Sequence, residues 1–275
     1  MTDPTRRKTR IVALSSGKGG VGKTFLSLNL AAALATRGRS VWLFDGDMGL
    51  ANVHVLLGLQ PQFDISDAVA GRCTLEQTLL DGPQGIKIIP GASGKREMAE
   101  MDATEMTHVI RSLAALEPAA DFMLIDTGAG IGKHVTTLAH FADTIVVVVR
   151  DEPASLADAY GLIKVMHQDF GSRNFEVLVN DASTIRRGQQ VFERLQQVAV
   201  RFLGLDLALA GVVPHELEVM TATRRRETLV TAAPRSAAAA AVVQIASHLE
   251  RSTVDAGHPG AALRLVGGMV EGDAR

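Results

Sequence analysis

Short runs of Val, Ile and Leu recur along the chain, and most of them are continuous rather than alternating with polar residues. The runs lie at residues 11–14, 41–44, 86–89, 122–125, 145–149, 177–179 and 207–213. A strand that is covered by helices on both faces has this pattern, which is typical of a parallel sheet. We therefore expect these runs to be buried strands of one mostly parallel sheet.

Longer segments between the runs carry apolar residues at helical spacing. They lie at residues 24–37, 104–116, 135–141, 155–170, 188–202 and 236–251. Because strands and helices alternate, the predicted fold class is α/β with a doubly wound sheet. No linker rich in Pro, Gly and Ser interrupts positions 10–251, so residues 1–251 are predicted to form one domain and residues 252–275 a C-terminal tail.

Composition narrows the range of functions. Of 275 residues, 47% are hydrophobic and the net charge is −2, which excludes a disordered chain and gives no general affinity for polyanions. The single cysteine, Cys73, excludes an internal disulfide and the paired cysteines of an iron–sulfur carrier. The sequence shows no signal-peptide pattern, and no apolar run approaches the roughly 20 residues of a membrane-spanning helix. We expect a cytoplasmic protein.

A glycine-rich loop follows the first predicted strand. Residues 17–24 fit the phosphate-loop pattern G-x-x-x-x-G-K-[ST] and lead directly into a predicted helix. In such a loop, backbone N–H groups converge on a β-phosphate, the Lys23 ammonium supplies charge at the β- and γ-oxygens, and the Thr24 hydroxyl is a ligand for Mg²⁺. The predicted nucleotide-binding residues are Gly17, Lys18, Gly19, Gly20, Val21, Gly22, Lys23 and Thr24.

Aspartates follow two of the predicted strands. Asp45 and Asp47 come after the run at 41–44, and Asp126 comes after the run at 122–125 in the Walker B pattern. In open α/β sheets, ligands bind at the carboxyl ends of the strands. We expect Asp47 to orient the attacking water, Asp45 to hold either a Mg²⁺-bound water or its own loop, and Asp126 to contact the hydrated Mg²⁺ and begin a switch loop.

The second lysine of the loop, Lys18, has no role in an ordinary phosphate loop. With it, the segment Gly-Lys-Gly-Gly-Val-Gly-Lys-Thr resembles the variant Walker A motif of the MinD/ParA superfamily. The resemblance implies that the protein hydrolyses ATP to ADP with Mg²⁺. It also implies an ATP-dependent homodimer in which Lys18 of each protomer reaches the phosphates of its partner. Lys18, Lys23 and Asp47 are then the expected catalytic residues.

Further segments resemble the MinD branch, and most of all its FlhG family of flagellar number regulators, also called FleN or YlxH. They are Asp-Gly-Asp-Met-Gly-Leu-Ala-Asn at 45–52, Asp-Thr-Gly-Ala-Gly-Ile at 126–131 and Glu-Pro-Ala-Ser-Leu-Ala-Asp-Ala-Tyr at 152–160. The resemblance covers residues 10–251. It implies that Glu152 and Asp158 lie near the dimer interface, that Asn180 contacts adenine and that Pro214 belongs to the loop on the other side of the base. A helix that starts at Pro153 explains much of the segment at 152–160 without any functional role.

Three biological outputs stay open. The first is an FlhG-like regulator of flagellar number or placement, acting through an FlhF-type GTPase or by restraining a flagellar transcriptional activator. The second is a MinD- or ParA-like ATPase that positions a septum, a chromosome or another cargo. The third is a nucleotide-gated binding scaffold or antiactivator with negligible turnover.

Two segments depart from a membrane- or DNA-binding pattern. Residues 261–271 carry one Arg, two adjacent Gly and a Glu, so we expect weak or no autonomous membrane binding and recruitment to the membrane or cell pole only by a partner. Arg224–Arg226 is predicted to be a solvated face at a helix start, without the interleaved aromatic residues of a nucleic-acid site. We expect no specific nucleic-acid partner and no zinc site.

Overall fold

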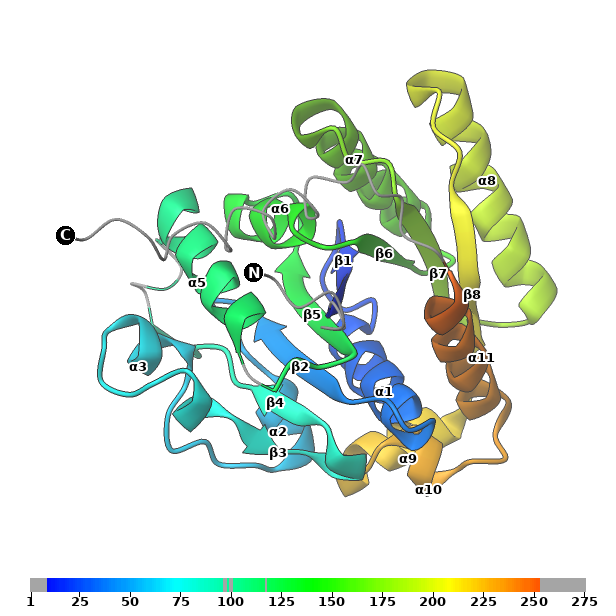
Figure 1. The fold of residues 1–275 in the computed structure, drawn as a ribbon. Helices are drawn as coiled ribbons and strands as arrows, with labels where there is room; N and C mark the ends of the chain where they lie inside the picture. Colours follow the sequence, from blue (N-terminus) through cyan, green and yellow to red (C-terminus); the bar gives the residue numbers. More distant parts are fainter. Residues whose placement is uncertain (1–8, 96–97, 99–100, 117, 253–275) are drawn as a thin grey trace.

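A computed structural model describes residues 9–95, 98, 101–116 and 118–252 of the chain. Its centre is an eight-stranded sheet with the order β3-β4-β2-β5-β1-β6-β7-β8 (Figure 1). The β3–β4 pair is antiparallel and the other pairs are parallel. The strands are β1 Arg10–Ser16, β2 Val41–Gly46, β3 Leu80–Asp81, β4 Lys87–Ile89, β5 Phe122–Ala129, β6 Thr144–Val149, β7 Phe175–Ala182 and β8 Ala208–Pro214.

Helices cover both faces of the sheet and make a three-layer structure (Figure 1). One face packs against α5 Ala103–Ala115, α6 Lys133–His140, α7 Pro153–Phe170 and α8 Ile185–Leu203. The other face packs against α1 Lys23–Thr36, α9 Leu217–Arg225, α10 Leu229–Ala232 and α11 Ala237–Arg251. Two short helices, α2 Val53–Leu57 and α3 Ile65–Val69, and the 3₁₀ turns η1 Glu76–Thr78 and η2 Pro83–Gly85 lie between β2 and β4.

Strand β1 illustrates why the apolar runs are continuous. Ile11 and Ala13 pack into the core beneath α5–α8, whereas Val12 and Leu14 pack into the core beneath α1 and α11. Successive side chains of a strand point to opposite faces, so a strand between two helical layers needs an apolar residue at every position. The two cores therefore follow directly from the sequence pattern, and the predicted α/β class is confirmed.

The first strand is also joined to the end of the described chain. The Arg10 guanidinium donates hydrogen bonds to the Leu249 carbonyl oxygen at the end of α11 and, at 2.6 Å, to the Ser252 carbonyl oxygen. Arg10 Nη2 donates to Ser252 Oγ at 2.9 Å and to Thr144 Oγ1 of β6 at 3.1 Å. These bonds satisfy carbonyl groups that a helix C-terminus leaves without a partner.

The seven apolar runs correspond to β1, β2 and β4–β8, and the six predicted helical segments to α1, α5–α8 and α11. The prediction for Arg224–Arg226 is wrong in one respect, because these residues end α9 instead of starting a helix. The Arg226 backbone has a φ of 59° and forms the left-handed C-cap of α9. The predicted tail lies outside the described residues beyond Ser252. Among the described helices, none has the length and apolar character needed to cross a membrane.

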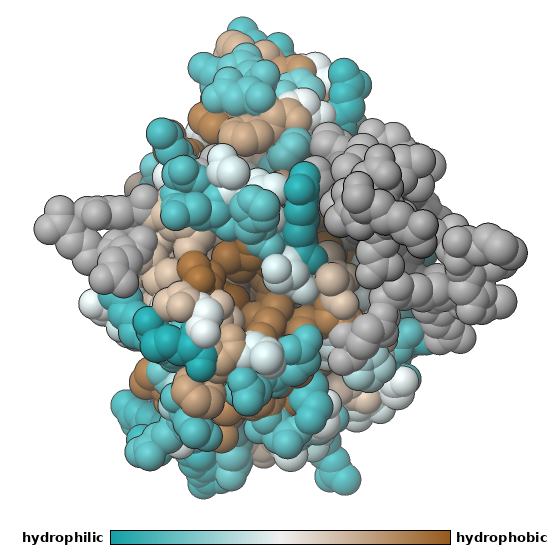
Figure 2. Space-filling view, turned by 60° about the vertical axis from the view of Figure 1, so that its left-hand side comes forward, coloured by the Kyte–Doolittle hydropathy of each residue, from teal (hydrophilic) through white to brown (hydrophobic). Residues whose placement is uncertain are grey.

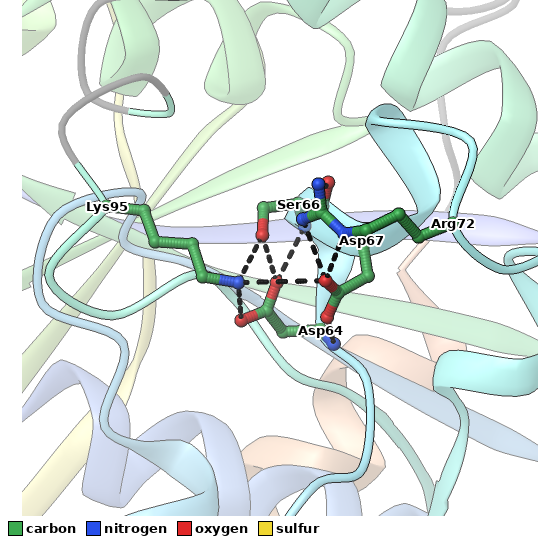
Figure 3. Close-up of polar contacts among 5 residues, drawn as sticks. All are labelled: Asp64, Ser66, Asp67, Arg72 and Lys95. Carbon is green, nitrogen blue, oxygen red and sulfur yellow. Dashed lines mark hydrogen bonds and ion pairs between the residues drawn. The ribbon is translucent and has the colours of Figure 1, made fainter.

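A polar cluster anchors the loop that follows β4 (Figure 3). The Lys95 ammonium bonds the Asp64 carboxylate at 2.8 Å and Ser66 Oγ at 2.5 Å, and Arg72 pairs with Asp67 on the same side of α3. The Ile65 N–H of α3 donates to the Pro90 carbonyl at 3.0 Å. These contacts fix the loop at 90–95 to α3.

The same loop contacts the segment after β2. Leu50 and Ser93 form an isolated antiparallel bridge, and the Gly94 N–H donates to the Gly49 carbonyl at 3.2 Å. A Cβ at Gly91 would lie 2.3 Å from the Asp45 carbonyl oxygen, so only glycine fits there. The loop at 90–95 is therefore held between α3 and the segment at 45–52. On this side of the molecule, where α3 and α5 lie, apolar side chains reach the surface in a hollow rimmed by hydrophilic ones (Figure 2).

Candidate functional site

The phosphate loop joins the central strand β1 to α1, with Ser16 ending the strand and Lys23 starting the helix. Gly22, the N-cap of α1, has a φ of 95°, a backbone conformation that side chains with a Cβ rarely adopt. A Cβ at Gly17 would lie 2.1 Å from the carbonyl oxygen of Asp158 in α7. The first and last glycines of the motif are thus required by one close approach and one left-handed turn, and the N–H groups of the helix end remain available to an anion.

Lys23 is buried in this loop, with 8% of its surface exposed. Its ammonium donates a hydrogen bond to Ser16 Oγ at 2.8 Å. Burial lowers the pKa of Lys23, and the charges of Asp126 and Asp47 act in the opposite direction. A buried cation with few partners is suited to bind a phosphate oxygen, because a strong charge-assisted bond then replaces the water that burial removed.

Asp126 and Thr24 lie together as predicted for a magnesium site. The Thr24 hydroxyl hydrogen-bonds the Asp126 carboxylate, and Ser27 Oγ donates to Asp126 Oδ1 at 3.1 Å. Burial raises the pKa of Asp126 to about 6, although the bonds from Thr24 and the charge of Lys23 lower it. A hydroxyl beside a buried carboxylate is the donor set that a hydrated Mg²⁺ takes in phosphate-loop proteins. The residues present therefore fit the metal.

Asp45 is fully buried and holds its own loop. Its Oδ2 accepts the N–H groups of Asn52 at 2.7 Å and Val53 at 2.8 Å, and its Oδ1 accepts the Asp47 N–H at 3.3 Å. Burial, with a further contribution from the charge of Asp126, raises the pKa of Asp45 to about 7. Of the two roles expected for Asp45, the geometry supports the one in which it holds the loop and the start of α2.

Asp47 lies between two loops that lead out of the sheet. Its Oδ1 accepts the Leu50 N–H at 3.2 Å, and a Cβ on Gly128 would lie 3.6 Å from the same oxygen. The loop after β5 is tied back to the phosphate loop, because the Gly130 N–H donates to the Ser16 carbonyl at 2.8 Å. A change in either loop would therefore move Asp47 relative to Lys23.

Lys18 and Glu152 are brought together within one chain. Lys18 Nζ lies 3.0 Å from Glu152 Oε2, and their side chains are 42% and 41% exposed. The hydrogen bond from Lys18 is the main reason that the pKa of Glu152 is lowered. Asp158 lies nearby on α7, where its backbone packs against Gly17. Both acidic residues predicted from the segment at 152–160 thus border the phosphate loop.

Asn180 and Pro214 lie at the carboxyl ends of the neighbouring strands β7 and β8. Asn180 Nδ2 donates to the Val21 carbonyl of the phosphate loop at 2.8 Å. A Cβ on Gly22 would lie 2.3 Å from the same nitrogen, so the amide occupies space that only glycine leaves free. These contacts place both predicted base-binding residues on the edge that carries the phosphate loop.

Sequence reasoning missed four polar residues of this edge, namely Ser16, Ser27, Arg150 and Asp181. Ser27 is three residues after Thr24 on the same helix face, and a polar residue inside a buried helix was the available signal. Asp181 has a φ of 58°, a left-handed conformation that the sequence around it does not predict. Its carboxylate is paired with Arg150. Arg150 follows an apolar strand as an ordinary end residue would, so its partners became visible only in three dimensions.

The raised pKa of Asp126 gives a prediction for the protein without nucleotide or Mg²⁺. As pH rises from about 4 to 6, the unfolded chain loses this proton before the folded one, so the carboxylate destabilises the fold progressively. The free energy of unfolding of the wild type relative to Asp126→Asn should fall over that range by up to about 3 kcal/mol because of Asp126 itself, and it should level off only above about pH 7, where Asp45 has also ionised. Asp126 also raises the pKa of Asp45. In Asp126→Asn the carboxylate of Asp45 is therefore less unfavourable, and this effect lowers the relative stability of the wild type in the same direction.

Urea denaturation from pH 4.5 to 7.5 measures this difference. The control is Asp169→Asn, which makes the same change at an exposed position of α7. A difference between wild type and Asp126→Asn that is constant or rises with pH would contradict the assignment.

Comparison with known proteins agrees with this geometry. The family model described as the CobQ/CobB/MinD/ParA nucleotide binding domain matches residues 12–230. The antiactivator FleN of Pseudomonas aeruginosa is 41% identical over 241 residues, which span 88% of this chain and 86% of that protein. The flagellum site-determining protein YlxH of Helicobacter pylori is 31% identical over 245 residues, spanning 88% and 82%.

A solved structure shows the same fold. The septum site-determining protein MinD from Pyrococcus horikoshii, complexed with Mg-ADP, superimposes with a TM-score of 0.74 at 26% identity and covers 88% of this chain and 96% of its own. The family match, the curated relatives and the site geometry lead to one conclusion: this chain belongs to the CobQ/CobB/MinD/ParA nucleotide-binding family, and within it is similar to the antiactivator FleN and the flagellum site-determining protein YlxH.

Proposed function

We propose that this protein is an ATPase whose ATP-bound form dimerises, and that the dimer regulates flagellar number or placement. The observation that carries the proposal is the convergence of Lys23, Thr24, Asp126 and Asp47 on one edge of the sheet, with Lys18 exposed beside them. The similarity to FleN and YlxH supports the flagellar output.

Binding begins with the phosphates. The loop N–H groups and the α1 N-terminus hold the β-phosphate, and Lys23 leaves its bond to Ser16 Oγ for a phosphate oxygen. Thr24 and Asp126 hold a hydrated Mg²⁺, which neutralises charge on the phosphates when bound. Asn180 and Pro214 flank the adenine at the ends of β7 and β8.

Hydrolysis requires a positioned water more than covalent chemistry by the protein. Asp47 accepts hydrogen bonds from its own loop and faces Gly128, so its carboxylate sits where the loops after β2 and β5 meet. In the proposed mechanism, Asp47 orients the attacking water, and loss of the γ-phosphate releases both loops.

Dimerisation uses Lys18. In the single chain this lysine is paired with Glu152 on the surface, where solvent screens the attraction between the two charges. A partner's phosphates carry more negative charge than one carboxylate, so Lys18 exchanges Glu152 for them when two ATP-bound protomers meet. The output then belongs to whatever binds the dimer, which we infer to be a flagellar transcriptional activator or an FlhF-type GTPase.

A second candidate output is the positioning of a septum or another cargo. The observation that favours it is the structural similarity to MinD at a TM-score of 0.74. The same ATP cycle would serve both outputs, and only the partner differs.

Dimerisation gives the first prediction of this proposal. With a non-hydrolysable ATP analogue and Mg²⁺, light scattering should give a mass near twice 29.2 kDa, and Lys23→Ala should stay monomeric because it loses the charge that binds the phosphates. Lys87→Ala, at the first residue of β4 and thus the opposite edge of the sheet, is the matched control and should dimerise. A wild type that stays monomeric at saturating nucleotide would overturn the dimer.

Hydrolysis gives the second prediction. Asp47→Ala should retain ATP binding but lower the hydrolysis rate by ~10²–10³-fold, because a carboxylate that positions water acts in the transition state. The dimer should then persist in ATP. Asp169→Ala is the matched control on the exposed surface of α7. If Asp47→Ala hydrolysed ATP at the wild-type rate and Asp45→Ala did not, the roles of the two residues would be exchanged.

The flagellar output is tested in the organism. Cells that lack this protein should show an altered number or placement of flagella by electron microscopy. Wild-type protein should restore the normal pattern, whereas Lys23→Ala should not, since it cannot bind nucleotide. Normal flagella together with misplaced division septa would instead establish the second output.

A further inference from the structure

A line of charged side chains connects the exposed lysine of the phosphate loop to the base-binding edge. Glu152 faces two cations, because its Oε2 lies 3.0 Å from Lys18 Nζ and its Oε1 lies 3.6 Å from Arg150 Nη1. The second guanidinium nitrogen of Arg150 bonds Asp181 Oδ2. Arg150 therefore bridges two carboxylates, one beside the lysine and one beside the base-binding residue Asn180.

Asp181 is held from both sides in an unusual backbone conformation. It has a φ of 58°, which costs energy for a residue with a side chain, and its Oδ1 accepts a hydrogen bond from His215 Nδ1 at 2.6 Å. The backbone N–H of His215 donates a hydrogen bond to the Ala182 carbonyl oxygen at 2.8 Å. Asp181 thus joins β6, β7 and β8 at their carboxyl ends, where Asn180 and Pro214 lie.

The charges of this line are linked. The charge of Arg150 lowers the pKa of Glu152, and the charge of Asp181 raises it, so both groups are close enough to affect the carboxylate that holds Lys18. The backbone of Arg150 is anchored to α7, since its N–H donates a hydrogen bond to Ser155 Oγ at 3.0 Å, whereas the guanidinium lies at the end of a flexible side chain. The guanidinium can therefore shift its pairing between the two carboxylates without a movement of β6.

We propose that Arg150 is a positioning residue that links the base-binding edge to the phosphate loop, because its division between Asp181 and Glu152 sets how firmly Glu152 holds Lys18. The proposal rests on the proposed function in one respect, namely that release of Lys18 permits dimerisation. When Arg150 pairs with Asp181, Glu152 holds the lysine; when Arg150 turns to Glu152, it competes with the lysine and frees it.

Two substitutions should act on Lys18 in opposite directions. Arg150→Ala leaves Lys18 as the one cation that contacts Glu152 among the described residues, so the lysine is held more firmly. Asp181→Asn leaves Glu152 as the one carboxylate paired with Arg150 in the described part of the chain, so the lysine is released. Both variants loosen the ends of β6 and β7 and should weaken adenine-nucleotide binding. If Arg150 and Asp181 were purely structural, the reactivity of Lys18 would change in the same direction in both variants.

The first readout is the rate at which an amine-reactive acetylating reagent labels Lys18 in the ADP-bound monomer, measured by mass spectrometry of the peptide. Labelling should slow by about threefold in Arg150→Ala and accelerate by about threefold in Asp181→Asn, the size expected for exposed ion pairs. Glu152→Gln, which removes the partner of the lysine, sets the upper limit of the rate. The affinity for fluorescent ADP should fall in both variants.

The matched control is Arg187→Ala. It removes a neighbouring ion pair with Asp151, which also follows β6. Among the described residues, the side chains of Arg187 and Asp151 form no hydrogen bond or ion pair with the side chains of Glu152 and Asp181. Lys18 labelling should equal that of the wild type. Thermal melting of every variant checks that the fold is retained.

Changes in Lys18 labelling that have the same sign in both variants, or no change in either, would overturn the role of Arg150. Sedimentation with a saturating non-hydrolysable ATP analogue should give a tighter dimer for Asp181→Asn and a weaker one for Arg150→Ala. Absence of a dimer in the wild type would refute the proposed function alone, since the labelling experiment uses the monomer. The two failures are therefore distinguishable.

Discussion

The site depends on one electrostatic constraint, the burial of two aspartates side by side in the sheet. Strands β2 and β5 pair in a register that sets Asp45 opposite Asp126, and both residues are almost completely buried. Two like charges in a medium of low polarity cannot both ionise without compensation. Asp45 receives three backbone N–H groups, and Asp126 receives two hydroxyls and the nearby charge of Lys23. The compensation is incomplete, because the pKa values of both carboxyls stay raised. A divalent cation bound beside Asp126 would supply the missing positive charge.

The hydrogen bonds that compensate Asp45 also couple it to the loop after β2. The N–H groups that stabilise Asp45 come from Asp47, Asn52 and Val53, so the charge state of a buried carboxylate and the shape of the loop after β2 are coupled. That loop in turn contacts residues 90–95, which Lys95 fixes to α3. A continuous series of contacts therefore connects the buried carboxylate of Asp45 to the surface helix α3.

The sequence predicted much of this arrangement because the strongest signals are local. Apolar runs identified the buried strands, and Gly17–Thr24 identified the phosphate loop, since each depends on adjacent residues. The order of the strands, and with it the pairing of Asp45 with Asp126, depends on contacts between distant segments and was not available. The short helices α2, α3 and α10 were missed because four or five residues give little periodicity, and the nine-residue α9 was missed as well. Arg150 and Asp181 were missed because long-range pairing, and not residue type, makes them special.

The strand that carries the phosphate loop lies at the centre of the sheet, and this has a consequence for how the chain folds during synthesis. Strand β1 is made first but pairs with β5 and β6, whose residues emerge from the ribosome more than a hundred positions later. Its contacts through Arg10 with Leu249 and Ser252 form only when the last helix has been made. The nucleotide site therefore cannot mature on a nascent chain that lacks β5 and β6. High contact order of this kind makes folding slow, so the growing chain exposes the apolar residues of β1 until β5 and β6 have been made, and chaperone protection is of most use in that interval.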